Sequence, residues 1–276
     1  MIFDIQSIAS SEKFIEEFFN TPIIKLIEKY IIQYNSNFDE FWIANKEYID
    51  SVDISDLKFK VIHVTSNMDE CSEIRTNGIK NLQRVLSEKT TLYTLLSNHG
   101  IQFDIKNRIL INKDRVIDID YKKYCNRGNL SDYDKKVKNI ARKVYTDYQV
   151  NGFFSIKDPI SYGTNIHKRP EFIFNLVELI PELRKMENHW VENSKGYIIT
   201  FLAANDQFQN ISFYDFEDIY YNKKEQELNL KKWLLYNAID CIIDCSINNT
   251  GIIAYMNTNT IIRPEQILEC SEITRE

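Results

Sequence analysis

The chain has 276 residues, 43% of them hydrophobic and 13% aromatic, so it has enough apolar surface to bury a sizeable core, and disorder is excluded for most of it. Its 34 Lys and Arg against 40 Asp and Glu give a net charge of −6, which argues against tight non-specific nucleic-acid binding and leaves only a local basic groove open. Only 7 Gly occur and no glycine-rich phosphate motif is present, which excludes dinucleotide-fold dehydrogenases and P-loop kinases.

The five cysteines contain no C-x-x-C pair, so the sequence predicts buried thiols and neither a disulfide framework nor a zinc site. The first residues lack a basic region followed by an apolar run. No uncharged apolar stretch of about 18 residues follows later. We therefore expect a cytoplasmic protein that makes no membrane contact.

The N-terminal part of the sequence has a helical pattern. Apolar residues recur at helical spacing over 14–34, with Thr21-Pro22 as a cap and a first-turn proline, and a short aromatic cluster at 38–42 folds back on this segment. An acidic stretch around 50–53 marks a boundary. The sequence thus predicts a helical segment over 1–52, packed on a main domain over 53–276.

Strand and helix patterns then alternate irregularly. Residues 59–65 read as a strand, followed by a short helix that ends at Gly78, a helix over 82–96, a hairpin of 101–104 with 108–111, and a further strand over 116–121. Later segments predict an amphipathic helix with a basic outer face over 131–148, a strand over 150–155, a loop over 158–168, a helix opening at Glu171, a strand over 196–202, a helix over 223–244 and a last strand over 251–256. Without regular βαβ alternation, the α+β class is favoured.

One histidine has a neighbour that suggests a site. Alternation along the strand 59–65 puts His63 and Thr65 on the same face, opposite Ile62 and Val64. Two polar groups therefore project together from one strand. A satisfied structural histidine is the simpler interpretation of His63 alone.

The residues around this strand resemble a known family. The run 63–66 (His-Val-Thr-Ser), an acidic helix start at 69–74 and Asn77-Gly78-Ile79 are similar to the opening of ADP-ribosyltransferase-fold proteins, including bacterial mono-ADP-ribosyltransferase toxins. A second strand, 152–155 (Gly-Phe-Phe-Ser) with Tyr162 downstream, and a closing strand and turn over 252–267 are similar as well. The resemblance extends over residues 58–270, but only these short segments within that range are similar.

The resemblance implies a split antiparallel sheet that holds NAD, with helical insertions. His63 and Thr65 would contact the adenosine ribose and the nicotinamide amide. Tyr162 or Phe154 would stack on the nicotinamide ring, and Ser155 would bond near the ribose. Lys168 and Arg169 would bind the pyrophosphate, and no metal is implied.

The catalytic carboxylate is the point of departure from the family. Family members place a glutamate on a late strand, whereas 253–256 (Ile-Ala-Tyr-Met) contains no acid. Glu171 is the best substitute, because it follows the loop 158–168 and has basic neighbours that keep it ionised. An ordinary first-turn glutamate is the competing interpretation.

These features give one leading hypothesis and three alternatives. The first is a mono-ADP-ribosyltransferase, as in a bacterial toxin or phage-defence effector, which transfers ADP-ribose from NAD to a protein or nucleic-acid acceptor and has a neutralising partner protein. The second is a catalytically silent member of the same fold that binds a nucleotide or a partner. The third is an interaction module that uses the acidic helical N-terminus. The fourth, a metal-dependent nuclease using Asp104, Asp118 and Asp120, has little support, because these acids lack a fixed spacing.

Overall fold

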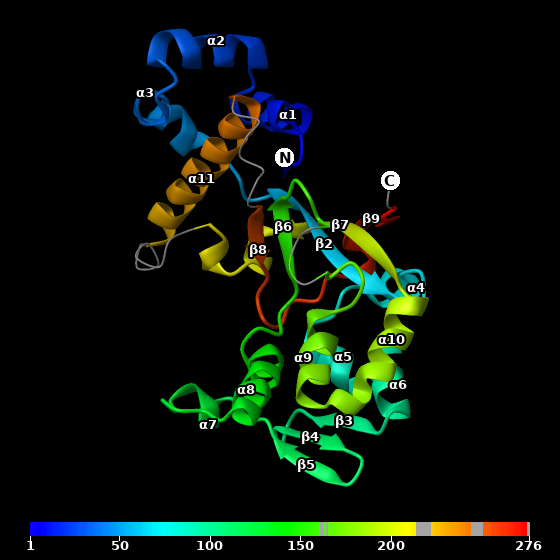
Figure 1. The fold of residues 1–276 in the computed structure, drawn as a ribbon. Coiled ribbons are helices and arrows are strands. Elements are labelled where there is room, and N and C mark those ends of the chain that lie inside the picture. Colours follow the sequence, from blue (N-terminus) through cyan, green and yellow to red (C-terminus); the bar gives the residue numbers. More distant parts are fainter. Residues whose placement is uncertain (161–162, 164, 214–221, 244–250, 275–276) are drawn as a thin grey trace. The chain divides into compact units, whose positions relative to one another are not determined.

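A computed structural model describes residues 1–160, 163, 165–213, 222–243 and 251–274 (Figure 1). The chain divides into two compact units. Unit 1 consists of Met1–Ile62, Gly152–Lys157 and Leu202–Tyr255, and unit 2 of His63–Asn151, Asp158–Phe201 and Met256–Glu276. Residues 1–52 thus lie in unit 1, and residues 53–276 are distributed over both units.

Unit 1 contains the N-terminal helices and a long C-terminal one: α1 (Ile8–Phe19), α2 (Ile23–Tyr34), α3 (Phe38–Ser51) and α11 (Lys223–Ile243). Local chemistry sets their ends. A capping box between Ser7 and Ser10 begins α1, and Asn20 and Asn35 end α1 and α2 in the left-handed conformation that asparagine tolerates. The segment 14–34, predicted as helical, therefore consists of two helices that meet around the predicted Thr21-Pro22 cap.

Aromatic side chains fill the core of unit 1. Phe154 is fully buried at its centre, and its ring centroid lies 5.6 Å from that of Phe59 and 5.2 Å from that of Trp233. Further rings that contact these three belong to Phe3, Phe208 and Phe213. Edge-on and tilted pairs of this kind stabilise a core beyond the area that they bury.

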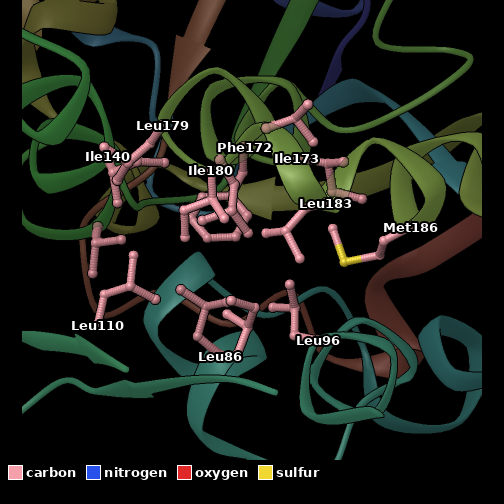
Figure 2. Packing of buried hydrophobic residues seen from close by; sticks show 14 of the residues in the cluster. Leu86, Leu96, Leu110, Ile140, Phe172, Ile173, Leu179, Ile180, Leu183 and Met186 are labelled. Carbon is pink, nitrogen blue, oxygen red and sulfur yellow. The ribbon is translucent and has the colours of Figure 1, made fainter. Parts of the chain in front are cut away.

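Unit 2 contains seven described α-helices: α4 (Ser72–Asn77), α5 (Leu82–Ser87), α6 (Thr91–Asn98), α7 (Lys122–Cys125), α8 (Asp132–Tyr145), α9 (Glu171–Leu179) and α10 (Arg184–Asn193). Its hydrophobic core lies between α5, α6, α8 and α9, where Leu86, Leu96, Ile140 and Phe172 point toward one another (Figure 2). Helix α8 buries one face with Val137, Ile140, Ala141 and Val144, as the predicted amphipathic helix requires, and it exposes Lys135 and Arg142.

A three-stranded antiparallel meander also belongs to unit 2, formed by β3 (Ile101–Asp104), β4 (Ile109–Asn112) and β5 (Arg115–Asp118). The register pairs Ile101 with Asn112 and Asp104 with Ile109. The predicted hairpin is therefore confirmed. The Asp104 carboxylate accepts hydrogen bonds from both the backbone and the side chain of Asn107, which fixes the turn.

The main sheet contains β1 (Ile2–Phe3), β2 (Lys58–Asn67), β6 (Asn151–Ser155), β7 (Lys195–Ala204), β8 (Ile252–Tyr255) and β9 (Ile267–Glu272). Its strand order is β8-β6-β2-β7-β9, and β1 pairs in parallel with β2. The pairs β2–β6 and β7–β9 are antiparallel. The α+β class is thus confirmed at the level of mixed helices with an antiparallel sheet.

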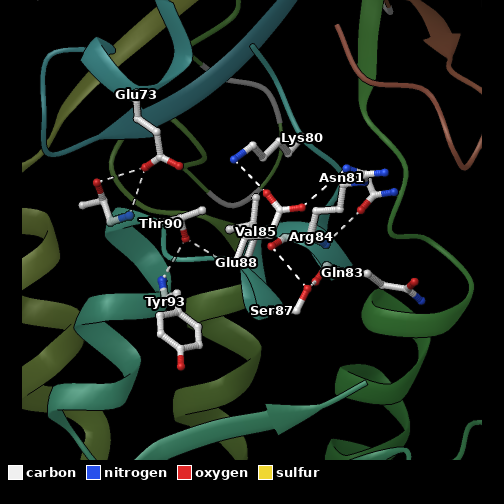
Figure 3. Close-up of polar contacts among 11 residues, drawn as sticks. Glu73, Lys80, Asn81, Gln83, Arg84, Val85, Ser87, Glu88, Thr90 and Tyr93 are labelled. Atoms are coloured by element: carbon white, nitrogen blue, oxygen red, sulfur yellow. Dashed lines mark hydrogen bonds and ion pairs between the residues drawn. The ribbon is translucent and has the colours of Figure 1, made fainter. Parts of the chain in front are cut away.

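Polar side chains set the turns around α5 and α6 (Figure 3). The Asn81 side chain accepts from the Arg84 backbone N–H at 3.0 Å and begins α5, while Thr90 accepts from the Tyr93 N–H at 3.1 Å and begins α6. The Glu73 carboxylate accepts from the Thr91 backbone N–H at 3.0 Å. The predicted single helix over 82–96 is therefore two, because Thr90 acts as a new N-cap in its middle.

Gly78 ends α4, as predicted, in a conformation with φ of +78°. A Cβ atom at this position would lie 2.0 Å from the carbonyl oxygen of Ile262. The close approach allows Ile79 and Ile262 to exchange two backbone hydrogen bonds of 2.8 and 3.1 Å. Glycine is required here both by the backbone angle and by the neighbouring chain.

Candidate functional site

Strand β2 presents His63 and Thr65 on one face. Their side chains are half-buried, whereas those of Ile62, Val64 and Ser66 are buried on the other side of the alternation. The strand therefore holds an imidazole and a hydroxyl next to each other at the surface of a packed sheet. Both residues belong to unit 2.

The imidazole of His63 is fixed by Asn151, the first residue of β6. Its Nδ1 lies 2.6 Å from the Asn151 carbonyl oxygen, and burial lowers the pKa of His63 although this hydrogen bond opposes the shift. A carbonyl oxygen only accepts hydrogen bonds, so Nδ1 carries the proton. In the neutral ring Nε2 is then an acceptor, ready to receive a hydrogen bond from a hydroxyl group.

The hydroxyl of Thr65 donates to the backbone carbonyl of Ser66 at 3.3 Å. Its oxygen has two lone pairs that accept hydrogen bonds. Thr65 and neutral His63 thus offer two acceptors on one strand face, which suits a ligand that donates from amide or hydroxyl groups. The same face would bind a carboxylate or phosphate poorly, because neither neutral acceptor attracts an anion.

Side chains of helix α10 contact both strand β2 and the segment that precedes α9. The buried Trp190 donates from Nε1 to the Ser66 hydroxyl at 2.9 Å. One turn earlier on the same helix face, the buried carboxylate of Glu187 forms an ion pair with Nε of Arg169 and another with Arg184. A single helix therefore anchors both the strand of His63 and the position of Arg169.

Arg169 is engaged by protein groups. Besides its ion pair with Glu187, its guanidinium lies 4.6 Å from the ring centroid of Phe174, within the range of a cation–π contact. To bind a pyrophosphate as predicted, the Arg169 guanidinium would have to bind the phosphates while it is also paired with the buried carboxylate of Glu187. Glu187 neutralises the charge that would attract the phosphates.

The backbone beside Arg169 packs against the beginning of β7. Ser194 donates its hydroxyl proton to the Lys168 carbonyl oxygen at 3.1 Å. A Cβ atom on Gly196 would lie 2.8 Å from the carbonyl oxygen of His167, so glycine allows this close approach. The segment 167–169 is thereby held against a strand that neighbours β2 in the sheet order.

Glu171 begins α9, as predicted, and its carboxylate has a specific partner. Lys143 of α8 lies 2.8 Å from Glu171 and 2.9 Å from Asp147. Burial lowers the pKa of Lys143, but its hydrogen bonds to these two carboxylates outweigh burial and raise the pKa overall. Glu171 is therefore half of an ion pair with a firmly protonated lysine.

The second predicted strand lies in unit 1. Phe154 is fully buried among aromatic rings, and a ring enclosed in this way has no face for a nicotinamide. Ser155 is also buried, at the end of β6. Tyr162, which is predicted to stack on the nicotinamide ring, lies outside the described residues.

Acidic residues do occur on a late strand, but they follow the segment 253–256 in which the family resemblance implies a glutamate. Strand β8 carries none, but β9 carries Glu269, which accepts from the Ser271 hydroxyl, and Glu272, which pairs with Lys195 at 2.9 Å. Both glutamates are exposed. Glu269 and Glu272 follow closely after the proline turn that ends at residue 267. This short distance in sequence is the signal that could have identified β9.

The aspartates of the nuclease alternative have protein partners. Asp118 pairs with Lys123, and Asp120 pairs with Arg108 at 2.7 Å. Within the described part of the chain, no group of three or more His, Cys, Asp or Glu residues has an arrangement that could hold a metal ion.

No family model, curated protein or solved structure matches this chain. Of the helices that the structure describes, none has both the length and the apolar character needed to cross a bilayer. The functional argument therefore depends on the residues and contacts given above.

Proposed function

We propose that this protein is a mono-ADP-ribosyltransferase that uses NAD and transfers its ADP-ribose to a protein or nucleic-acid acceptor. The observation that carries the proposal is the strand face of β2, where neutral His63 presents Nε2 next to the Thr65 hydroxyl. The chain has an antiparallel sheet, and helices come before and after its strands in sequence. This arrangement is compatible with the split sheet that the sequence resemblance implies.

The two acceptors suit NAD at two different points. Nε2 of His63 would accept a hydrogen bond from a hydroxyl of the adenosine ribose, and the Thr65 hydroxyl would accept from the nicotinamide amide. Positioning of this kind raises the rate because it holds the glycosidic bond in a reactive orientation. The His63 ring is pre-oriented by Asn151, so little conformational freedom is lost on binding.

The reaction exchanges one bond for another at the anomeric carbon. The bond between C1′ and the nicotinamide nitrogen breaks, and its electron pair leaves with nicotinamide. A nucleophile of the acceptor forms the new bond to C1′ and releases its proton. Positive charge develops on the ribose in between, so a nearby carboxylate stabilises the transition state.

Glu171 is the proposed carboxylate, and Lys143 limits what it can do. An ammonium group 2.8 Å from the carboxylate offsets much of the negative potential that a developing oxocarbenium ion needs. Catalysis by Glu171 therefore requires Lys143 to turn toward Asp147, its second partner at 2.9 Å. If the pair with Glu171 persists when NAD is bound, the alternative function applies.

That alternative is a catalytically silent protein of the same fold that binds a nucleotide. The neutralised Glu171 and the absence of an acid from β8 favour it. In this case His63 and Thr65 would bind NAD or a related nucleotide without cleaving the glycosidic bond.

The test is incubation of the full chain with NAD labelled in the adenylate part, alone and with a cell lysate. Nicotinamide release and label transfer support the transferase, and binding by calorimetry without release supports the silent alternative. Neither binding nor release by a folded protein would overturn both.

Matched variants identify the residues. His63→Ala should reduce NAD binding or turnover at least tenfold, whereas His99→Ala, which removes a ring also bonded to a backbone carbonyl, should leave both unchanged. Glu171→Gln should abolish turnover and retain binding. Glu178→Gln, on the same helix, is its control.

A further inference from the structure

Positive charge is concentrated in one part of unit 2. Residues 105–143 contain 12 Lys and Arg against 5 Asp and Glu, a net charge of +7, whereas the whole chain has a net charge of −6. The rest of the chain therefore carries −13. Solubility does not require such a separation, because the surface of a soluble domain usually mixes both signs. The segment forms β4, β5, α7 and most of α8.

Helix α8 carries three of these cations in one row. Lys135, Lys138 and Arg142 are three and four positions apart, so they follow one another along the helix. Lys135 and Arg142 are exposed, and Lys138 is half-buried. The row extends for about 10 Å along the helix axis, which matches about three stacked nucleotides of one strand.

Helix α7 and strand β5 add cations next to this row. Helix α7 packs against α8 (Figure 1), and Lys122 and Arg127 are exposed on it and directly after it. At the beginning of β5, the exposed Arg115 donates to the hydroxyl of Tyr133, in the first turn of α8, at 2.8 Å. These contacts join the three elements. Their cations form what we call the basic surface of unit 2: Arg115, Lys122, Arg127, Lys135, Lys138 and Arg142.

The cations of the basic surface can be given to a ligand. Four of the six form no ion pair with a carboxylate of the described residues. The other two, Lys135 and Arg142, pair with Asp132, whose side chain is 92% exposed, and with Asp147 at 3.5 Å. Surface ion pairs contribute little and are screened by salt, so a phosphate can replace the carboxylate in each.

Two arginines of the basic surface lie over tyrosine rings. The guanidinium of Arg115 is 5.1 Å from the ring centroid of Tyr133, and that of Arg127 is 6.0 Å from the ring centroid of Tyr124. Tyr133 is exposed. The bases of a single strand stack on aromatic rings and on guanidinium planes. The surface therefore offers contacts for bases as well as for phosphates.

The same surface is poorly suited to an anionic membrane. A helix that binds at a membrane interface inserts its apolar face among the lipids. In α8 that face consists of Val137, Ile140, Ala141 and Val144, which are fully buried in the core of unit 2. Lipid binding would have to depend on charge alone, whereas a single strand also uses the tyrosines.

We propose that the basic surface of unit 2 binds a single-stranded nucleic acid, with its cations on the phosphates and Tyr133 against a base. The net charge of −13 on the rest of the chain repels the strand and confines it to this surface. Binding involves neither NAD nor the residues assigned to its site. The inference therefore goes beyond the proposed transferase activity, and each can fail without the other.

The test measures the fluorescence anisotropy of labelled oligonucleotides of about 20 nucleotides, mixed with the full chain in the absence of NAD. Single-stranded RNA, single-stranded DNA and a DNA duplex are compared. We expect micromolar binding of a single strand at about 50 mM salt and a steep loss of affinity at about 200 mM, because each phosphate contact releases counterions. The tighter of the two single strands identifies the ligand as RNA or DNA. Tighter binding of the duplex, binding of phosphatidylserine vesicles alone, or no binding would overturn the proposal.

Matched double variants test where the strand binds. Lys122→Ala with Arg127→Ala should weaken binding at least fivefold and reduce the slope of log K against log salt by about 1.4, because two phosphate contacts are lost. Lys25→Ala with Lys46→Ala removes the same charge from exposed positions of unit 1 and should leave binding within about twofold. Equal losses in both double variants would show an effect of net charge alone and would overturn the proposal.

A tyrosine variant tests the contact with a base separately from the charge. Tyr133→Ala should weaken binding about fivefold or more and leave the salt slope unchanged, because stacking releases no counterions. Tyr236→Ala, which removes an exposed tyrosine of α11, is the control and should bind as the wild type does. Unchanged affinity of Tyr133→Ala would overturn the base contact.

Discussion

The indole Nε1–H of Trp190 donates a hydrogen bond of 2.9 Å to the hydroxyl oxygen of Ser66, and both side chains are buried. Ser66→Ala leaves a buried donor without its acceptor, so we expect unfolding to become easier by about 1–3 kcal/mol in urea titrations. In a double-mutant cycle with Trp190→Phe, the two losses should not add, and the coupling should be about 1 kcal/mol. Strictly additive losses would show that this bond does not stabilise unit 2.

Replacement of Gly78 should be far more costly than replacement of another loop glycine. In Gly78→Ala the new methyl group meets the Ile262 carbonyl oxygen at a φ that side chains disfavour, so we expect a loss of at least about 2 kcal/mol in the free energy of unfolding. Gly128 has open space around it, and Gly128→Ala should stay within about 0.5 kcal/mol of the wild type. Equal melting temperatures for the two variants would contradict the close approach.

Two adjacent lysines of α11 should respond differently to truncation. The Lys231 side chain is 1% exposed, and its ammonium donates to the Asp50 carbonyl oxygen at 3.1 Å and pairs with Glu227 at 2.9 Å. We expect Lys231→Ala to cost about 2–4 kcal/mol through lost packing and the lost hydrogen bond to the Asp50 carbonyl. Lys232→Ala breaks a pair with Asp39 near the surface and should cost less than about 1 kcal/mol. Chemical denaturation of both variants in parallel is the measurement.

The lowered pKa of His63 predicts a pH dependence of stability. The unfolded imidazole has a pKa near 6.5, so below about pH 6.5 the unfolded state binds a proton that the folded state still excludes. The contribution of His63 is therefore fully present above this pH, and it is lost as the pH falls toward the folded pKa. We expect the difference in unfolding free energy between wild type and His63→Gln to shrink from pH 7.5 to pH 5. A difference that does not change with pH would contradict an imidazole that stays neutral in the folded protein.

Elements with local signals could be predicted from the sequence. The hairpin of β3 and β4, the glycine end of α4 and the start of α9 at Glu171 all depend on residues next to one another in the chain. Helix α10 was not predicted, because the segment Arg184–Asn193 is mostly polar and buries only Met186, Glu187 and Trp190. Strand β9 was also missed, since most of its side chains are half-buried or exposed and give no apolar alternation.

The residue types of the candidate site could be predicted, but their partners could not. Alternation was enough to place His63 and Thr65 on one face, whereas Asn151, which fixes the imidazole, is 88 positions away. In the same way, no spacing rule connects Glu171 with Lys143 or Arg169 with Glu187. These partners decide the protonation state and the available charge, so the chemistry of the site follows from the tertiary structure.

The path of the chain between the two units limits the order in which they are completed during synthesis. Unit 1 includes Met1 and residues as late as Tyr255, so the contact of α11 with α1 cannot form while most of the protein is still untranslated. Helices α1 and α3 both contact α11, so they are translated before the helix that covers them. A deletion near residue 230 would therefore leave α1 and α3 without the helix that they contact.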